Sequence, residues 1–207
     1  MASVISFISR KGGTGKTTNA IHLATTLNHE GNTVLLIETD ANYTLSTLRR
    51  MELRAANGTP PPFDILGSKD EDVAKELSSI RSTNKVDYLI VDCAGKTTDE
   101  GIRKLSLISD AIIVPTSLTQ NDLLVTYQTV TDLAPARKLN PNLRILILPN
   151  RIHNSTALYT VRENLKNLDA TILPVIVPQK NLFVNFSTLT PERDYFPIAA
   201  EILKNLS

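Results

Sequence analysis

Short apolar runs alternate with amphipathic segments along most of the chain. The apolar runs are rich in Val, Ile and Leu and cover Val4–Ile8, Thr33–Ile37, Val86–Val91, Ala111–Val114, Arg144–Leu148 and Thr171–Val177. Such runs are typical of strands buried on both faces of a parallel sheet. Helical periodicity between and after them covers Thr17–His29, Val73–Arg81, Asp122–Leu133, Thr156–Asn167 and Pro197–Leu206. The alternation predicts an α/β fold: a doubly wound, mostly parallel β-sheet with helices on both faces.

Composition limits the choice of protein class. The 207 residues carry a net charge of +1 and are 42% hydrophobic, which predicts one globular domain over residues 1–207. The Pro-rich segment at residues 57–62 has apolar sequence on both sides and is expected to be a loop inside that domain. The single Cys excludes a disulfide framework or a paired-cysteine metal site within one chain. With no long apolar run and no export signal, we expect a cytoplasmic protein.

Residues 10–18 read Arg-Lys-Gly-Gly-Thr-Gly-Lys-Thr-Thr, directly after a predicted strand and at the start of a predicted helix. Closely spaced glycines let a backbone approach a polyphosphate and point its N–H groups inward. A lysine then supplies charge for the β- and γ-phosphates, and a hydroxyl binds Mg²⁺. The segment predicts a site for ATP and Mg²⁺, made of Gly12, Gly13, Thr14, Gly15, Lys16, Thr17 and Thr18, with Thr17 on the metal.

The loop departs from the common phosphate-loop pattern at its start. Arg10 stands where that pattern has Gly, and a second lysine, Lys11, lies five residues before Lys16. The sequence Lys-Gly-Gly-Thr-Gly-Lys-Thr-Thr resembles the deviant Walker A motif of the ParA/MinD family of dimeric ATPases. The resemblance implies a P-loop NTPase fold and a homodimer that closes around ATP. It also implies that Lys11, as a catalytic residue beside Lys16, reaches the partner's phosphates.

Two acidic segments lie where this family has its carboxylates. The residues from Glu38 to Asn42 align with the family pattern Asp-x-Asp-Pro-Gln, which implies that Asp40 orients the attacking water near the metal. Glu38 replaces the first Asp, and Ala41-Asn42 replaces Pro-Gln, so the conformation of this loop stays open. In the sequence, a solvated turn acid would look the same as Asp40. A buried strand-end Asp with only a capping role would look the same as Asp92 in the second segment.

The strand predicted at residues 86–91 is followed by Asp92 and resembles a Walker B element, whose carboxylate holds Mg²⁺ through a water. The following Cys-Ala-Gly resembles the small ParF-type plasmid-partition branch. The resemblance implies that the N–H group of Gly95 senses the γ-phosphate. It also implies that Asn150 and Pro178 border the adenine.

The charge distribution suggests a partner. Residues 134–191 hold seven basic and two acidic side chains, a candidate footprint for nonspecific DNA, although a solvated face without a partner would look the same. The expected contacts are Arg137, Lys138, Arg162, Lys166 and Lys180. The segment at residues 197–206, with one Lys and one Glu, predicts a helix packed on the sheet and no membrane binding.

The resemblance implies a slow ATP hydrolase that binds DNA as an ATP dimer, associates with the nucleoid and segregates plasmid or chromosomal DNA with a small centromere-binding adaptor. Two alternatives stay open at this point. One is an ATPase of the same fold that positions a protein cargo, and the other is a nucleotide switch with little hydrolysis. A metabolic relative is disfavoured, because the iron–sulfur types need paired cysteines.

Overall fold

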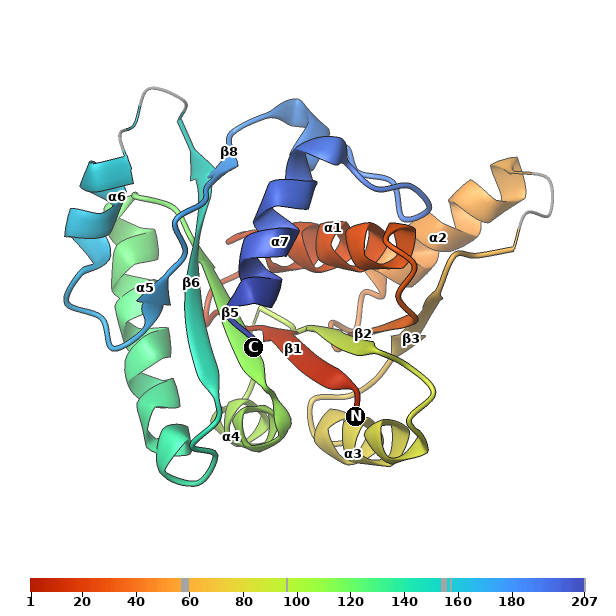
Figure 1. The fold of residues 1–207 in the computed structure, drawn as a ribbon, viewed down its shortest axis with the longest axis horizontal. Helices are drawn as coiled ribbons and strands as arrows, with labels where there is room; N and C mark the ends of the chain where they lie inside the picture. The colour runs from red at the N-terminus through yellow and green to blue at the C-terminus, as the bar shows by residue number, and fades with distance from the viewer. Residues whose placement is uncertain (57–59, 96, 154–155, 157, 207) are drawn as a thin grey trace.

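The strands form one parallel sheet. The computed structural model describes residues 1–56, 60–95, 97–153, 156 and 158–206 (Figure 1). Within these, the strands are β1 Ser3–Phe7, β2 Val34–Glu38, β3 Asp64–Gly67, β4 Tyr88–Asp92, β5 Ala111–Thr116, β6 Arg144–Ile152, β7 Thr171–Ile172 and β8 Val177–Pro178. Their order in space is β3-β2-β4-β1-β5-β6-β7, and β8 also pairs with β6. Every described pairing is parallel, which confirms the predicted doubly wound α/β fold.

Helices cover both faces of this sheet (Figure 1). They are α1 Lys16–His29, α2 Thr44–Ala55, α3 Val73–Thr83, α4 Asp99–Ile108, α5 Gln120–Leu133, α6 Leu158–Leu165 and α7 Phe196–Lys204, with 3-10 turns at Ala134–Lys138, Asn181–Phe183 and Arg193–Tyr195. Side chains of α1, α2 and α7 share one apolar cluster with one face of the sheet. Side chains of α3, α4, α5 and α6 share a second cluster with the other face. The sheet therefore lies between two separate cores.

The last helix closes the first of these cores. Ile198, Ala199 and Ile202 of α7 are buried and share a cluster with α1, so the predicted packing of this segment on the sheet side is confirmed. Among the described residues, no helix combines the length and the apolar character needed to cross a bilayer.

The sequence prediction of a single strand at Thr171–Val177 is wrong. The segment forms two short strands, β7 and β8, separated by four residues that include Pro174. A proline has no N–H to donate and interrupts a ladder. The break lets β8 pair with β6 beyond the point reached by β7, at Asn150 and Ile152. It thereby places Pro178 beside the carboxyl end of β6. Residues 57–59 of the Pro-rich loop lie outside the described residues.

The carboxyl ends of β1, β2, β4, β5 and β6 meet at one edge of the sheet. Here β1 has β4 on one side and β5 on the other. The chain runs from β1 to β2 on the β4 side, whereas the later connection from β4 crosses to β5 on the other side of β1. Such a reversal leaves a crevice above the strand ends, where α/β proteins bind ligands. The glycine-rich loop follows β1 directly at that point.

Candidate functional site

The phosphate loop connects β1 to the first turn of α1. Gly13 has φ of 76° and Gly15 has φ of 100°, in the left-handed region that glycine tolerates. A Cβ atom on Gly15 would lie 2.2 Å from Nδ2 of Asn150, so a larger residue would displace that side chain as well as strain the backbone. A Cβ atom on Gly95 would lie 3.0 Å from Cα of Gly12, which places the expected γ-phosphate sensor against the loop. The strand ends thus fix the shape of the loop.

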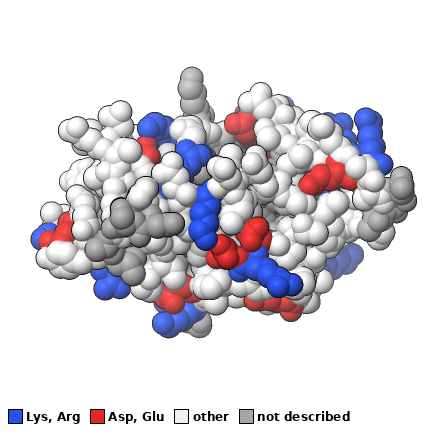
Figure 2. All heavy atoms as spheres, turned by 90° about the horizontal axis from the view of Figure 1, so that it is seen from above, with Lys and Arg blue, Asp and Glu red and all other residues white. Residues whose placement is uncertain are grey.

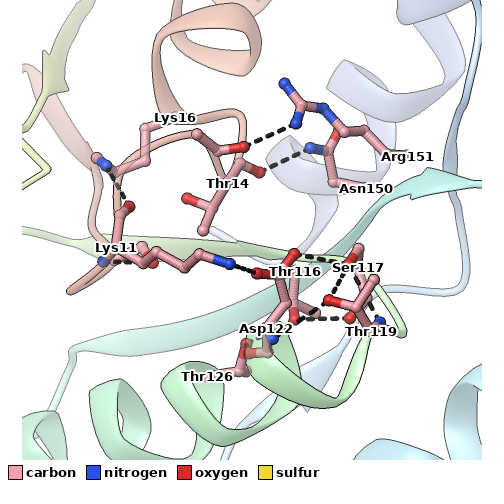
Figure 3. Close-up of polar contacts among 12 residues, drawn as sticks. Lys11, Thr14, Lys16, Thr116, Ser117, Thr119, Asp122, Thr126, Asn150 and Arg151 are labelled. Atoms are coloured by element: carbon pink, nitrogen blue, oxygen red, sulfur yellow. Dashed lines mark hydrogen bonds and ion pairs between the residues drawn. The ribbon is translucent and has the colours of Figure 1, made fainter.

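Lys16 is the first residue of α1, directly after the glycines of this loop. Its side chain belongs to a residue only 5% exposed, and its Nζ atom donates a hydrogen bond of 3.2 Å to the carbonyl of Lys11 (Figure 3). Burial lowers the pKa of Lys16, and the nearby carboxylate of Asp92 opposes this shift. The buried ammonium group therefore lies against the backbone of the loop, and the N-terminus of α1 beside it favours an anion such as a polyphosphate.

Asp92, the last residue of β4, provides the opposite charge. The residue is 2% exposed, and its Oδ1 atom has no hydrogen-bond partner among the described residues. Burial raises the pKa of Asp92 to about 7, although the Thr17 hydroxyl and Lys16 both act to lower it. A buried carboxylate oxygen without a donor is costly unless a cation meets it. Asp92 and Thr17 therefore fit a Mg²⁺ ion.

The rest of the donor set also fits Mg²⁺ better than other metals. Within the described part of the chain, no group of three or more His, Cys, Asp or Glu side chains could hold a metal ion. Mg²⁺ keeps several waters and is held by one or two protein ligands together with substrate phosphates. Thr17 and Asp92 would supply those ligands, and the ion would neutralise phosphate charge.

Glu38 and Asp40, at the end of β2, have different surroundings. Glu38 is 1% exposed, and its carboxylate accepts hydrogen bonds from Leu45 N at 3.0 Å, from Ser46 N at 2.9 Å and from the Ser46 hydroxyl. It caps the first turn of α2 from inside the protein. Asp40 is half-buried, and its Oδ1 atom accepts a bond of 3.0 Å from Asn42 N. Asp40 therefore lies in a tight turn between the strand and α2.

Lys11 lies on its own chain's surface. Its Nζ atom is 2.7 Å from Oδ1 of Asp122, in the first turn of α5, and the lysine side chain is 43% exposed (Figure 3). Asp122 also accepts a bond of 2.6 Å from the Ser117 hydroxyl. Partial burial of Asp122 acts to raise its pKa, but the bonds from Lys11 and Ser117 outweigh it and lower the pKa. The side chain of Lys11 is thus held against α5 and not against the glycines of its own phosphate loop.

Arg10, the other departure from the common loop pattern, has a structural role that sequence reasoning missed. Its guanidinium group forms ion pairs with Asp99, the first residue of α4, at 2.6 Å, and with Asp132 of α5. These two acids raise the pKa of Arg10. Arg10 therefore ties the start of the phosphate loop to two helices on one face of the sheet.

A cavity of about 260 Å³ opens beside the phosphate loop. Its lining includes Thr18, Asn150 and Pro178, three residues that the sequence places far apart. Asn150 is 3% exposed; its Nδ2 atom donates to the carbonyl of Thr14 at 2.7 Å, and its Oδ1 atom accepts from Asn19 at 3.3 Å. The side chain of Asn150 therefore braces the phosphate loop.

The basic residues expected to contact DNA are partly neutralised by acids. Arg137 pairs with Asp169 at 2.7 Å, Lys166 with Glu163 at 2.6 Å and Lys180 with Asp194 at 2.7 Å. Arg162 is exposed on α6, and Lys138 is exposed at the end of a 3-10 turn. Basic and acidic side chains are interspersed on the face drawn in Figure 2. These five residues do not form one continuous patch of unpaired charge.

The fold and this loop define a nucleotide-binding protein of the P-loop class. The CobQ/CobB/MinD/ParA nucleotide binding domain family matches residues 5–186, and the chain belongs to this family. Members of the ParA/MinD group are nucleotide hydrolases.

Known relatives are similar over most of their length. The maintenance of carboxysome distribution protein A of Halothiobacillus neapolitanus is 24% identical over 185 residues, covering 89% of this chain and 83% of that protein. A plasmid partition protein of Borrelia burgdorferi bound to AMPPNP superposes with a TM-score of 0.70 at 22% identity, covering 99% of this chain and 97% of that one. The MinD cell division protein of Aquifex aeolicus gives a TM-score of 0.71 at 21% identity, covering 99% and 95%.

Proposed function

We propose that the chain is a ParA-like ATPase that dimerises when it binds ATP and Mg²⁺, binds nonspecific DNA as a dimer, and hydrolyses ATP slowly. In this proposal a small centromere-binding adaptor speeds hydrolysis, and the cycle segregates plasmid or chromosomal DNA. The family assignment supports the ATPase, and the plasmid partition protein among its structural neighbours makes DNA a reasonable cargo.

The observation that carries the proposal is the separation of the two lysines. Lys16 is buried inside its own loop, whereas Lys11 is half-exposed and bound to Asp122 on the outside of the site. A surface ion pair of this kind contributes at most about 1 kcal/mol, so Lys11 can leave it at low cost. A second chain that closed over the loop would offer Lys11 a phosphate in exchange.

The other side chains have assigned places in this proposal. Lys16 and the N–H groups from Gly12 to Thr18 bind the polyphosphate, and Thr17 and Asp92 hold the metal. Asp40, in its turn between β2 and α2, orients the attacking water, and Gly95, packed on Gly12, senses the γ-phosphate. Hydrolysis removes the group that Lys11 contacts, so the dimer opens.

Light scattering tests the core of the proposal. The molar mass is measured without nucleotide, with ADP and with ATP, each with and without a nonspecific DNA duplex. We expect a monomer without nucleotide and with ADP, and a dimer that binds DNA with ATP. A monomer under all conditions that does not bind DNA would refute the partition function. It would favour a metabolic role or an inactive switch.

A second candidate is an ATPase that positions a protein assembly. The similarity to a carboxysome distribution protein over 89% of the chain favours it. Deleting the gene in its host separates the two candidates. Partition predicts an increased rate of plasmid or chromosome loss, whereas a protein cargo predicts normal inheritance and a misplaced assembly. A third candidate, a switch with little hydrolysis, predicts ATP-dependent dimers without turnover, even with the partner present.

A further inference from the structure

Arg151 has an unusual backbone conformation. Its φ is 56°, in the left-handed region that a bulky residue rarely adopts. The ladder between β6 and β8 shifts register at this point, because Asn150 pairs with Val177 and Ile152 pairs with Pro178. Strained positions of this kind, and bulges that redirect a side chain, are concentrated at functional sites. The strain therefore suggests that the direction of this side chain matters.

The irregularity turns Arg151 away from the core. The flanking Asn150 and Ile152 are 3% and 2% exposed, whereas Arg151 is exposed and lines the cavity beside the phosphate loop. Its Nη1 atom donates a hydrogen bond of 2.8 Å to the carbonyl of Gly13 (Figure 3). The side chain thus extends from the end of β6 to the phosphate loop, along one side of the cavity.

The other walls of the cavity combine apolar and polar side chains. The apolar ones are Val177, Pro178, Phe183 and Val184, and the polar ones are Thr18, Asn150, Gln179, Lys180 and Asn181. Asn150 already uses its amide to brace Thr14 and to accept from Asn19. A planar guanidinium group in a cavity that also presents Pro178 and Phe183 suits a flat aromatic ring, because it stacks on the ring face through cation–π attraction.

We propose that Arg151 is a binding residue of the base site: it stacks on one face of a purine ring, and its bond to Gly13 holds the guanidinium group in that position. The inference rests on the nucleotide binding in the proposed function. It adds a residue that the sequence pattern did not single out, since an arginine after a strand carries no motif.

Calorimetric titration of the full chain with ADP and with pyrophosphate, both with Mg²⁺, tests the assignment. Pyrophosphate occupies the phosphate loop without a base. We expect Arg151→Ala to weaken ADP binding about tenfold, equivalent to about 1.4 kcal/mol, and to leave pyrophosphate binding unchanged. Arg144→Ala, an exposed arginine at the opposite end of the same strand, serves as the matched control and should change neither affinity.

Other outcomes overturn the assignment in distinguishable ways. Equal weakening of ADP and pyrophosphate would mean that Arg151 acts only through Gly13, and unchanged affinities would mean that it does not contact the base. Failure of the unmodified chain to bind either ligand would refute the nucleotide site itself, and this inference with it. Arg151→Gly guards against misfolding, because glycine accepts a φ of 56° without strain. It should keep the thermal stability and still show the selective loss of ADP binding.

Discussion

Two buried charged residues, Asp92 and Lys16, prepare the phosphate site for its ligands and lower the stability of the empty protein. Asp92 is buried with one carboxylate oxygen unpartnered, and Lys16 is buried beside it. Burial shifts both pKa values toward the neutral forms, upward for the acid and downward for the lysine. A site that must accept polyphosphate and a divalent cation cannot satisfy these groups internally. We therefore expect that removing the buried charge of Asp92 stabilises the protein but weakens the binding of nucleotide and Mg²⁺.

Asp92→Asn tests this trade-off through pH. Because burial raises the pKa of Asp92 from 3.8 to about 7, the folded chain binds more protons than the unfolded chain between these values. Stability from this group is present below pH 4 and is lost as pH rises through 7. Between pH 5 and pH 8, unmodified protein should lose on the order of 2–3 kcal/mol more than the variant.

Thermal unfolding at the two pH values, without nucleotide or metal, measures that difference. The variant should also lose Mg²⁺-dependent nucleotide binding. Asp64→Asn, at an exposed aspartate at the start of β3, should keep the pH dependence of the unmodified chain. If Asp92→Asn keeps it as well, the carboxylate is not protonated as its burial requires.

Lys11 and Asp122 give a second residue-scale prediction. Asp122→Asn keeps the shape and the bond with Ser117 but removes the charge that holds Lys11. The competing pair is weakened by up to about 1 kcal/mol in each of the two chains. The ATP-dependent dimer should therefore form up to about thirtyfold more tightly in sedimentation at constant salt. Lys11→Ala should retain nucleotide binding but lose the dimer and turnover. A Lys11→Ala variant with normal turnover would show that Lys11 does not act on the partner's phosphates.

At the scale of elements, Glu38 links the sheet to α2. The family pattern has Asp at this position, and the longer side chain here reaches two backbone N–H groups and a hydroxyl at the start of α2. Since Asp40 and its turn lie between these two anchors, the cap also sets the position of Asp40. The carboxylate of Glu38 thus has a structural role at the start of α2.

Glu38→Ala should destabilise the protein by about 2–3 kcal/mol, because it leaves buried N–H groups without an acceptor. Amide hydrogen exchange should accelerate in residues 40–50, and turnover should fall as Asp40 loses its position. Thr98→Ala is the matched control. It removes the hydroxyl that caps α4 through Gly101 N, should cost about 1 kcal/mol, and should leave exchange in α2 unchanged. Equal exchange rates in both variants would contradict the role of Glu38.

Hydrophobic patterning predicted the central strands because they are buried on both faces, and the glycine-rich loop predicted the phosphate site. The hydrophobic pattern did not predict α2, β3 and α4, which are amphipathic or edge elements with few buried residues. In α2, for example, only Leu45 and Arg49 are buried. The contacts of Arg10 and Arg151 were equally invisible. Each depends on residues about 90 or more positions away, and no local pattern records such a contact.

At the scale of the whole molecule, acidic side chains neutralise some of the basic residues counted in residues 134–191. Three of the five residues expected to bind DNA are paired with acids, each partly exposed to solvent. Exposed pairs are weak, so phosphates of a duplex can compete for these cations. In the proposal, a dimer doubles the number of basic side chains that can reach the duplex, and several weak interactions then act together.

The double charge reversal Arg162→Glu with Lys166→Glu tests whether this surface contacts DNA. Both residues are exposed on or just after α6, and Lys166 is paired only to the neighbouring Glu163 among the described residues. If each cation meets a phosphate, the reversal should weaken ATP-dependent DNA binding at least tenfold at fixed salt. It should also reduce the slope of log affinity against log salt by roughly 0.9 for each phosphate that is no longer neutralised.

Lys69→Glu with Lys75→Glu, an equal charge change at exposed lysines in and before α3, controls for net charge. Equal weakening in both variants would show that net charge, and not this surface, governs binding.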